Sequence, residues 1–452
     1  MFSTLLSGKV TTLRRSKLVQ GGLVVGATIL LGNITGFFRV AVTAYLLGTH
    51  ARADALAVAI GFIDTLNSVI VNTMLFAFVP MLLLRHGGER AALFARAAGV
   101  FVSIFAAISF ASALFAPQLV AVLGPGLAAP ERVQAVGLLR WLAPSTLFAT
   151  GAAAFSALLY TERRFVIPGM YQTCLNGATI AGALLLFKTM GVNGFAIGYT
   201  AGSAIQLGLA WSFSGDLRRE PRSELQVPLG EVLMKPGMFL LYAALISGNL
   251  MVTRIFATHG GPGMAAAFDY SMRCLSVVLA YLVYPVASTL VPEIARLRGT
   301  NDTSKAYSLI DTGVLLMAIA AVLSCALAVL LRTPIIAMLF ERGNFTPEST
   351  QLVSAVFLGF APSLIGWSLL DLIARCFFAL NRPKLPLIAA MIPITVNLAV
   401  TSILRSQGKL TSPITLGLGA SIGLLTGFAV LFAMVQIWRS ATPEPVQLTT
   451  AP

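Results

Sequence analysis

Long apolar runs recur along the whole chain, and each is long enough to cross a lipid bilayer as one helix. We count about twelve runs, each at or above the ~20 residues that a transmembrane helix requires. The runs cover residues 18–48, 54–83, 97–123, 135–160, 165–187, 193–215, 238–258, 264–292, 308–331, 350–380, 385–404 and 411–438. Because backbone groups in lipid must bond internally, these runs predict an all-α polytopic membrane protein.

The composition agrees with a chain that lies mostly in lipid. Only 11% of the 452 residues are charged and 57% are hydrophobic, whereas a soluble domain carries about 25% charged residues. The net charge of +14 does not indicate a nucleic-acid partner, because no basic cluster is interleaved with stacking aromatic residues. The first run is longer than the apolar core of a signal peptide, so we expect a retained first span.

The Lys and Arg residues of the connecting loops divide into two alternating sets. One set holds 19 cations and the other 7 of the 31 in the chain. The positive-inside rule places the larger set in the cytoplasm, together with both termini. This asymmetry also favours an even number of spans.

The two halves of the sequence resemble each other at nearly constant offsets. Gly32-Asn33 recurs as Gly248-Asn249, and "LAPS" at 142–145 recurs as "FAPS" at 360–363. Six spans per half make both halves enter the membrane in the same direction, which predicts parallel repeats. We therefore expect two six-helix lobes around a central cavity, which is a transporter architecture. The predicted divisions are an N-terminal lobe at 1–215, a cytoplasmic linker at 216–237, a C-terminal lobe at 238–440 and a cytoplasmic tail at 441–452.

Five arginines lie within the predicted spans: Arg39, Arg140, Arg254, Arg273 and Arg375. A centrally placed arginine costs about 2.5–3.5 kcal/mol on insertion scales, so each needs water, a partner or a route to the interface.

Arg39 has threonines rather than acids one turn away on both sides, so we expect it to face a cavity and to contact cargo. Arg254 lies near the end of its run, where snorkelling and cavity exposure are equally consistent. Arg140 is expected to anchor at the interface.

Two further arginines follow an acid at the i+4 spacing that brings side chains together on one helix face. Arg273 follows Asp269, and Arg375 follows Asp371. Each pair is either structural or able to exchange its carboxylate for a cargo phosphate, which a guanidinium grips with two hydrogen bonds.

Asp64 lies inside the second span, and Asp54 lies at the outer end of that span. An acid within a span is a candidate for cation or proton coupling, and Asp64 is equally a candidate partner for Arg39 on the neighbouring helix. The sequence alone leaves both interpretations open.

No pattern indicates an enzyme, a cofactor or a metal. The sequence has neither a phosphate-binding loop nor a nucleophile elbow, and its three histidines lie far apart at loop edges. Its four cysteines have no zinc spacing. Without a nucleotide site, transport would have to use a coupling ion, the membrane potential or downstream chemistry.

Several motifs together resemble the MviN/MurJ family of lipid-linked precursor flippases, in the multidrug/oligosaccharidyl-lipid/polysaccharide exporter superfamily. They are "TGFFRVAVTAYLLGTHARADALAVAI", "FAFVPML", "FDYSMRCLSVVLAYLVYPVASTLVPEIARL", "LFERGNFTPEST" and "LIARCFFALNRPKLP". The resemblance covers residues from about 20 to about 400.

The resemblance implies movement of an undecaprenyl-pyrophosphate-linked cell-wall precursor, lipid II or a related saccharide, across the bacterial cytoplasmic membrane by alternating access. It implies that Arg39 and Arg273 line a cationic cavity, with Asp54 at its outer end. Arg254, Arg375 and Asp64 join them as candidate cargo-binding residues. Membrane lipid and cell-wall synthesis enzymes are the other partners that it implies. Val40 stands where the family usually has an acid after the arginine, and this leaves the cargo saccharide open.

Two other functions are consistent with a polytopic chain. A cation-coupled exporter of small amphipathic compounds would need an acidic cavity, whereas arginines outnumber the mid-span acids here. A membrane scaffold that recruits cell-wall enzymes would leave the charges within the spans unexplained.

Overall fold

The structure is a computed structural model that describes residues 17–218, 221, 227–299, 303–380, 382 and 384–441. Within these ranges the chain forms helices, turns and loops but no strand, which confirms the all-α prediction. Both termini, residues 442–452 of the expected tail and most of 219–226 in the expected linker lie outside the described residues.

The helices follow one another with short connections. The first half contains α2 (Lys17–Leu47), α3 (Ala51–Thr73), the π-helix η1 (Met74–Phe78), α4 (Val79–Leu83), α5 (Gly87–Leu114), α6 (Ala116–Leu123), α7 (Ala129–Leu142), α8 (Pro144–Thr161), α9 (Val166–Gly169), α10 (Tyr171–Met190), α11 (Asn193–Phe213) and α12 (Gly215–Arg218). The second half contains α13 (Leu229–Ala257), the 3-10 turn η2 (Thr258–Gly260), α14 (Met264–Gly299), α15 (Thr303–Phe340), α16 (Pro347–Phe360), α17 (Ser363–Ala379), α18 (Lys384–Ser406), the 3-10 turn η3 (Lys409–Thr411) and α19 (Pro413–Ala441).

Ten of the described helices are long and apolar enough to cross a membrane, or eleven if the bent pair α16 and α17 counts as one span. The prediction of about twelve spans is therefore not confirmed as a count. The predicted span at 193–215 is present as helix α11, but it is not among these ten. Its Gly, Ser, Thr and Gln residues lower its hydropathy.

The prolines of "LAPS" and "FAPS" mark the breaks in two predicted spans. Pro144 opens α8 directly after α7, and Pro362 is the N-cap residue of α17 after α16. The second break bends the helix pair by 47°. Proline causes such breaks because it lacks an N–H group and clashes with the preceding turn.

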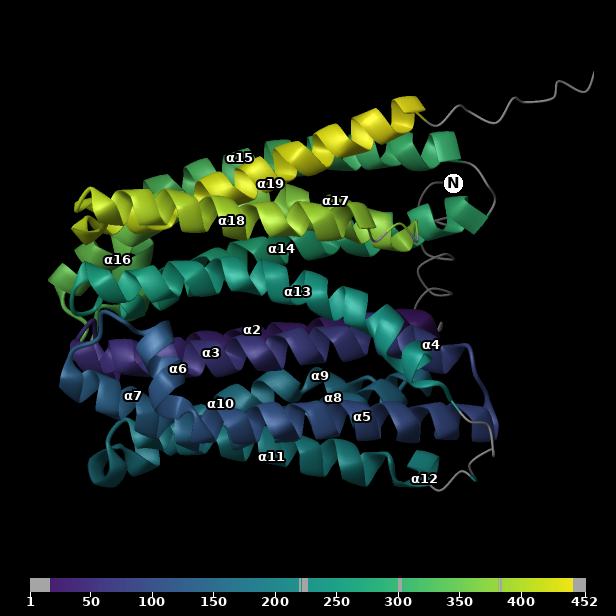
Figure 1. Cartoon of the computed structure of the whole chain (residues 1–452), viewed down its shortest axis with the longest axis horizontal. Helices are drawn as coiled ribbons and strands as arrows, with labels where there is room; N and C mark the ends of the chain where they lie inside the picture. Colours follow the sequence, from purple (N-terminus) through teal and green to yellow (C-terminus); the bar gives the residue numbers. More distant parts are fainter. Residues whose placement is uncertain are drawn as a thin grey trace, which may run out of the picture. The chain divides into compact units, whose positions relative to one another are not determined.

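The chain divides into two compact units, and the division falls inside α13. The first unit contains the residues up to Ala244 together with Arg342–Phe345, and the second contains Leu245–Glu341 and the residues from Thr346 onward. Within each unit the long helices run nearly parallel or antiparallel to one another (Figure 1). Residues from Leu229 onward in the predicted linker belong to α13. The predicted lobe limits stay a prediction.

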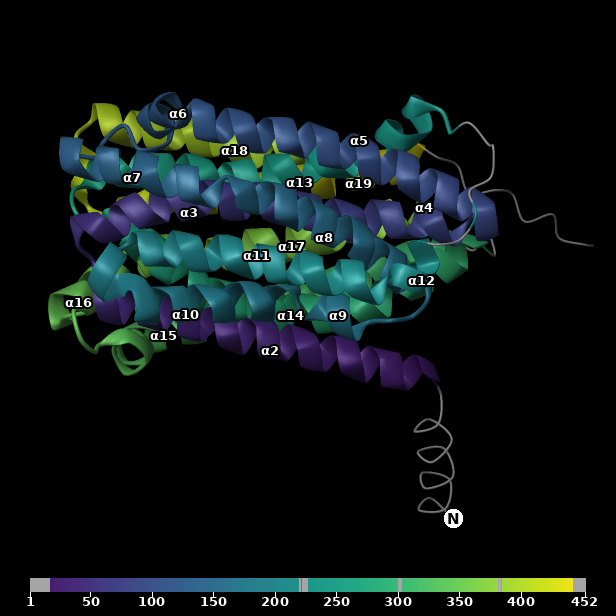
Figure 2. The same cartoon turned by 90° about the horizontal axis from the view of Figure 1, so that it is seen from below.

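Close packing of α10 against α11 depends on small residues in the first unit (Figure 2). A Cβ atom on Gly198 would lie 2.4 Å from the Ala178 carbonyl oxygen, and one on Gly202 would lie 2.8 Å from that of Cys174. Gly194 makes a similar approach to Gly182. Glycines spaced by four residues let two membrane helices approach this closely.

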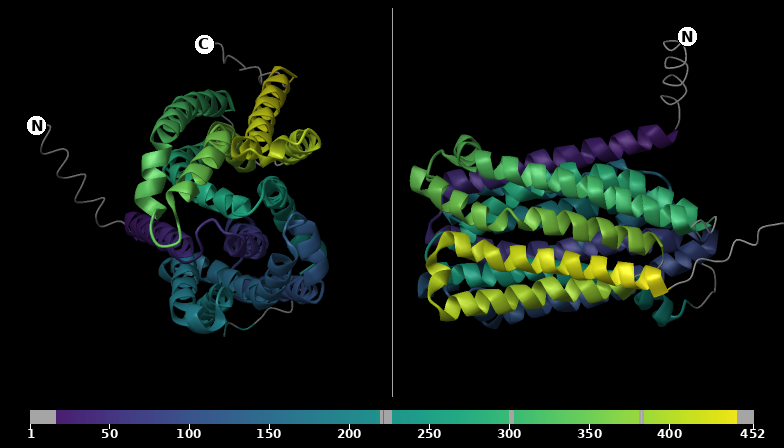
Figure 3. Two further views of the ribbon diagram at one scale, coloured as in Figure 1. Left: turned by 90° about the vertical axis from the view of Figure 1, so that its left-hand side faces the viewer. Right: turned by 90° about the horizontal axis from the view of Figure 1, so that it is seen from above.

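The second unit repeats this arrangement with α18 and α19, which run side by side (Figure 3). A Cβ atom on Gly423 would lie 2.5 Å from the Pro393 carbonyl oxygen, and Gly419 and Gly427 make equally close approaches to α18. In each unit an asparagine of this helix pair also donates to the Gly-Asn dipeptide: Asn176 to the Gly32 carbonyl (3.3 Å) and Asn397 to the Asn249 carbonyl (2.9 Å). The internal repeat is therefore visible in the packing of each unit.

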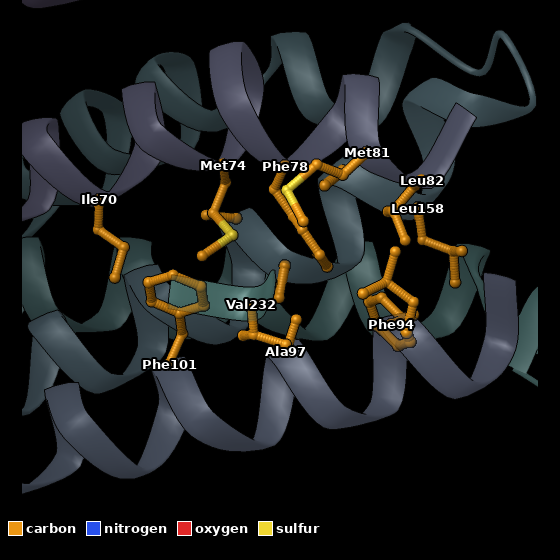
Figure 4. Close-up of a cluster of buried hydrophobic side chains, with 14 of the residues drawn as sticks. Ile70, Met74, Phe78, Met81, Leu82, Phe94, Ala97, Phe101, Leu158 and Val232 are labelled. Atoms are coloured by element: carbon orange, nitrogen blue, oxygen red, sulfur yellow. The ribbon is translucent and has the colours of Figure 1, made fainter. Parts of the chain in front are cut away.

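A cluster of buried hydrophobic side chains fills the first unit around the π-helix η1. Met74 and Phe78 point toward Ala97 and Phe101 of α5, and Val232 of α13 lies between them (Figure 4). This packing holds α3, α5 and α13 together, and α3 is the helix that carries Asp54 and Asp64.

The C-terminal end of α2 is capped by a segment that is distant in sequence. The Asn344 backbone N–H donates to the Tyr45 carbonyl oxygen (2.9 Å), and its side-chain Nδ2 donates to the Leu46 carbonyl oxygen (2.7 Å). Gly48 follows the helix with φ +56°, and a Cβ atom there would lie 2.1 Å from the Asn344 carbonyl oxygen. The contact satisfies carbonyl groups that every helix end leaves unpaired.

Candidate functional site

Arg39 of the first unit forms an ion pair with Asp64 on the neighbouring helix. The distance from the Arg39 Nη2 atom to the Asp64 Oδ2 atom is 3.3 Å, and the side chains are 18% and 37% exposed. Arg39 lies eight residues before the end of α2, about 12 Å along the helix. Of the two interpretations left open for Asp64, the structure favours the partner of Arg39.

A buried polar network holds the other oxygen of Asp64. The Tyr199 hydroxyl of α11 donates to Asp64 Oδ1. Asn67 Nδ2 donates to the Tyr199 hydroxyl (3.3 Å) and to Ser145 Oγ of α8 (3.4 Å). Tyr199, Asn67 and Ser145 are at most 2% exposed. Four helices of the first unit thus contribute to one polar network, and two of them donate directly to the Asp64 carboxylate.

The sequence did not indicate Tyr199 or Ser145. Tyr199 lies 135 residues after Asp64, and no spacing rule connects them. A polar residue in an otherwise apolar run was the only available signal, and several such residues occur in α10 and α11.

Asp54 lies nearer the start of α3 than Asp64 does. It is 3% exposed and occupies the first turn of α3, ten residues before Asp64, or about 15 Å along the helix. A carboxylate at this position complements the positive end of the helix dipole. Asp54 and Asp64 therefore occupy two different levels of the first unit.

Arg254 of the second unit is paired with Asp269. Its Nε and Nη2 atoms lie 3.1 and 2.8 Å from Asp269 Oδ1, and the two side chains are 13% and 25% exposed. The guanidinium also lies over the Phe268 ring, 5.6 Å from its centroid. The pair joins the end of α13 to the start of α14.

The Arg254–Asp269 pair has a counterpart in the sequence of the first half, which the i,i+4 spacing rule does not detect. Asp269 follows Arg254 by fifteen residues, and Asp54 follows Arg39 by the same number. The recurrence marks equivalent positions of the internal repeat, across the turn between two helices.

Arg375 and Asp371 form the i,i+4 pair that the sequence predicts, with 2.8 Å between Nε and Oδ2. The pair lies toward the end of α17 that leads to α18, whereas Arg254 lies near the turn that joins α13 to α14. Arg273 is half-buried on α14, one turn after Asp269. The structure therefore brings Arg254 and Asp269 together in the second unit and places Arg375 at the opposite end of that unit's helices.

Other charged side chains lie at helix ends. In the first unit Arg85 bonds to Glu231 (2.8 Å), Arg90 bonds to Glu162 (2.6 Å) and Arg164 bonds to Asp216. The hydrogen bonds from Arg164 lower the pKa of the exposed Asp216 carboxyl below its ordinary value. The described residues contain no group of three or more His, Cys, Asp or Glu side chains that could hold a metal ion.

The outer surface of the helices is apolar. Leu185 of α10 and Leu330 of α15 are 78% and 75% exposed, and many other large hydrophobic side chains are similarly open. Such surfaces fit contact with lipid tails rather than with water.

Comparisons with known proteins give one consistent family. The family model for "Lipid II flippase MurJ" matches residues 43–447. A protein of Rhizobium meliloti (strain 1021), named "Probable lipid II flippase MurJ", is 27% identical over 460 residues, which cover 96% of this chain and 83% of the relative.

Solved structures have the same fold. "Lipid II flippase MurJ, inward closed conformation" matches with a TM-score of 0.79 and 21% identity, and it covers 92% of this chain and 87% of that one. An "outward-facing conformation of a multidrug resistance MATE family transporter of the MOP superfamily" matches with a TM-score of 0.66 and 14% identity, over 95% and 97% of the two chains.

Proposed function

Because this chain belongs to the lipid II flippase MurJ family, whose model matches residues 43–447, we propose that it moves an undecaprenyl-pyrophosphate-linked cell-wall precursor across the membrane. Its apolar helices and its family make it a multi-pass protein of the bacterial inner membrane. The proposed cargo is lipid II or a related lipid-linked saccharide.

The observation that carries this proposal is the half-buried Arg39, which is paired with Asp64 inside a bilayer-length helix. A guanidinium at this depth is expensive unless its charge is used or neutralised. A diphosphate is a better acceptor for it than a carboxylate, because it offers more oxygens and more charge. We propose that Arg39 in the first unit and Arg273 in the second unit contact the cargo diphosphate.

Arg254, Arg375, Asp54 and Asp64 complete the set of proposed cargo-site residues. Arg254 and Arg375 are each bonded to an acid of their own unit, so their contribution requires that a phosphate replace that acid. Asp54 is buried at the start of α3, where it would act on the shape of the site rather than on a phosphate.

We propose that transport proceeds by alternating access. Solved proteins with this fold include one in an inward closed and one in an outward-facing conformation, which supports this proposal. We propose that both termini lie in the cytoplasm, on the basis of the loop charges, and that cell-wall synthesis enzymes use the translocated product.

The alternative of a cation-coupled exporter shares the fold, because a MATE-type structure matches as well. A fold alone does not distinguish the cargo. The arginines within the spans favour an anionic cargo over a cationic one.

The experiment is complementation of a bacterial strain whose own lipid II flippase is depleted. The wild-type chain should restore growth, and Arg39→Ala and Arg273→Ala should each fail at equal protein levels in the membrane. Arg296→Ala is the matched control, because Arg296 is 63% exposed and bonds to Glu293 on its own helix. Full growth with both span variants would rule out the proposed diphosphate contact.

A further inference from the structure

The Asp64 carboxylate is shared between two donors that come from different helices. Arg39 of α2 takes Oδ2, and Tyr199 of α11 takes Oδ1. We infer that Asp64 is a counter-ion that the cargo diphosphate displaces from Arg39, and that Tyr199 holds the displaced carboxylate in place. This inference rests on the proposed function.

The contact between Arg39 Nη2 and Asp64 Oδ2 is longer than the contacts in the Arg254–Asp269 and Arg375–Asp371 pairs. Its length is 3.3 Å, beyond the ≈ 2.7–2.9 Å of strong charge-assisted bonds. Arg254, in contrast, uses two nitrogens at 3.1 and 2.8 Å and lies over the Phe268 ring. An anion that arrives in the membrane therefore exchanges more readily for Asp64 than for Asp269.

Tyr199 stabilises the Asp64 carboxylate after such an exchange. A carboxylate inside a span that loses its cationic partner is destabilised unless another donor remains. The Tyr199 hydroxyl already donates to Asp64 Oδ1, and Asn67 Nδ2 in turn donates to that hydroxyl (3.3 Å). Successive hydrogen bonds polarise one another, so this chain stabilises the negative charge.

The network is also well placed to keep Asp64 still. Tyr199 is fully buried and Asn67 is 2% exposed, so neither side chain has room to follow Asp64 elsewhere. Asn67 is fixed by a second bond to Ser145 Oγ (3.4 Å). When the diphosphate leaves, Asp64 is therefore still beside Arg39 and can bond to it again.

This arrangement sets the affinity of the first unit for its cargo. Asp64 competes with the diphosphate for Arg39, which prevents binding from becoming too tight for release. Tyr199 reduces that competition by sharing the carboxylate. Removal of the Asp64 charge should therefore raise the affinity for the diphosphate, and removal of the Tyr199 hydroxyl should lower it.

The test is binding of farnesyl pyrophosphate, a short polyprenyl diphosphate, to the purified full-length protein in detergent. We expect Asp64→Asn to lower the dissociation constant about tenfold, because the competing charge is gone. We expect Tyr199→Phe to raise it about threefold, because Asp64 then depends more on Arg39.

A matched control shares the chemistry but not the contact. Asp311→Asn removes an acid near the start of α15 that accepts from Arg439 near the end of α19 (2.8 Å). This variant should bind the probe as the wild type does.

Unchanged or weaker binding by Asp64→Asn would overturn the inference, and so would tighter binding by Tyr199→Phe. Tyr199→Phe keeps the ion pair, so it reports even if Asp64→Asn unfolds early in a thermal melt. If the wild type binds the probe and Arg39→Ala binds it equally well, the diphosphate contact in the proposed function is wrong as well. Dependence on Arg39 without the two opposite shifts would leave that contact standing and remove only the counter-ion role.

Discussion

At the scale of single residues, three of the five arginines within the predicted spans pair with acids of the same unit. Arg39 pairs with Asp64, Arg254 with Asp269 and Arg375 with Asp371. Pairing lowers the penalty of a charge in the membrane, and removal of one partner leaves an uncompensated charge. The three pairs differ in geometry, because Arg254 bonds to its acid through two nitrogens and Arg39 has the longest contact of the three.

Arg254→Ala should therefore reduce stability more than Arg39→Ala does. Its two bonds to Asp269 and its contact with Phe268 tie the end of α13 to the start of α14, so we expect a loss of about 1–3 kcal/mol. Thermal unfolding of the detergent-solubilised variants measures the difference. Equal melting temperatures for the two variants would contradict the larger contribution of the Arg254–Asp269 pair to stability.

Gly48→Ala should also destabilise the first unit, at the end of α2. The residue has φ +56°, and the new Cβ atom would lie 2.1 Å from the Asn344 carbonyl oxygen, so the capping segment must move. Gly87→Ala is the matched control, because Gly87 has φ +51° with open space around it.

The control should lose only the ~1–2 kcal/mol of a left-handed backbone, and Gly48→Ala should lose more than this. Thermal unfolding of both variants gives the comparison. A melting temperature for Gly48→Ala at or above that of Gly87→Ala would exclude the steric contact with Asn344.

At the scale of elements, hydropathy predicted most helices. The run at 54–83 is present as α3, η1 and α4, and the prolines at 144 and 362 mark breaks within two other predicted spans. The weakly hydropathic α11 shows the limit of this method. Its polar residues serve contacts with other helices, such as that of Tyr199 with Asp64, and a sequence window does not contain those partners.

The site was predictable in the same uneven way. The Asp371–Arg375 pair is local, so the helix period predicts it. The Asp64–Tyr199 contact joins residues 135 positions apart, and only tertiary packing creates it. The internal repeat was predicted in part. The glycines of α11 and α19 share a four-residue spacing in the sequence, but the motifs that we aligned did not include these glycines.

Those glycines give a prediction for the helix pairs. Gly198→Leu in α11 should prevent the close approach to α10, because even a Cβ atom would lie 2.4 Å from the Ala178 carbonyl oxygen. Gly208→Leu, in the same helix, meets nothing within 4 Å of the new Cβ atom and serves as the control. The melting temperature should fall for Gly198→Leu and not for Gly208→Leu. Equal melting temperatures for the two variants would contradict the close packing of α10 and α11.

At the scale of the whole molecule, two repeated units form one membrane transporter chain. Each unit has a glycine-packed helix pair and an asparagine that donates to the preceding Gly-Asn dipeptide. Each also carries at least one arginine paired with an acid within its spans. The repetition is consistent with a family in which one cargo is presented to both sides of the membrane in turn.

The orientation of the chain is testable with single cysteines in a cysteine-free background. The loop charges place Arg163 in the cytoplasm and Glu131 outside. A maleimide that does not cross the inner membrane should therefore label Glu131→Cys in intact cells and should label Arg163→Cys only after lysis. The reverse pattern would invert the proposed topology.

The most direct test of the account is transport by the purified protein in liposomes. The measurement is the rate at which a fluorescent undecaprenyl-pyrophosphate-linked saccharide moves between leaflets, for the wild type, Arg39→Ala and the surface control Arg296→Ala. The account predicts movement by the wild type and the control, and a rate at least about tenfold lower for Arg39→Ala. Equal rates for all three proteins, or no movement by the wild type, would contradict it.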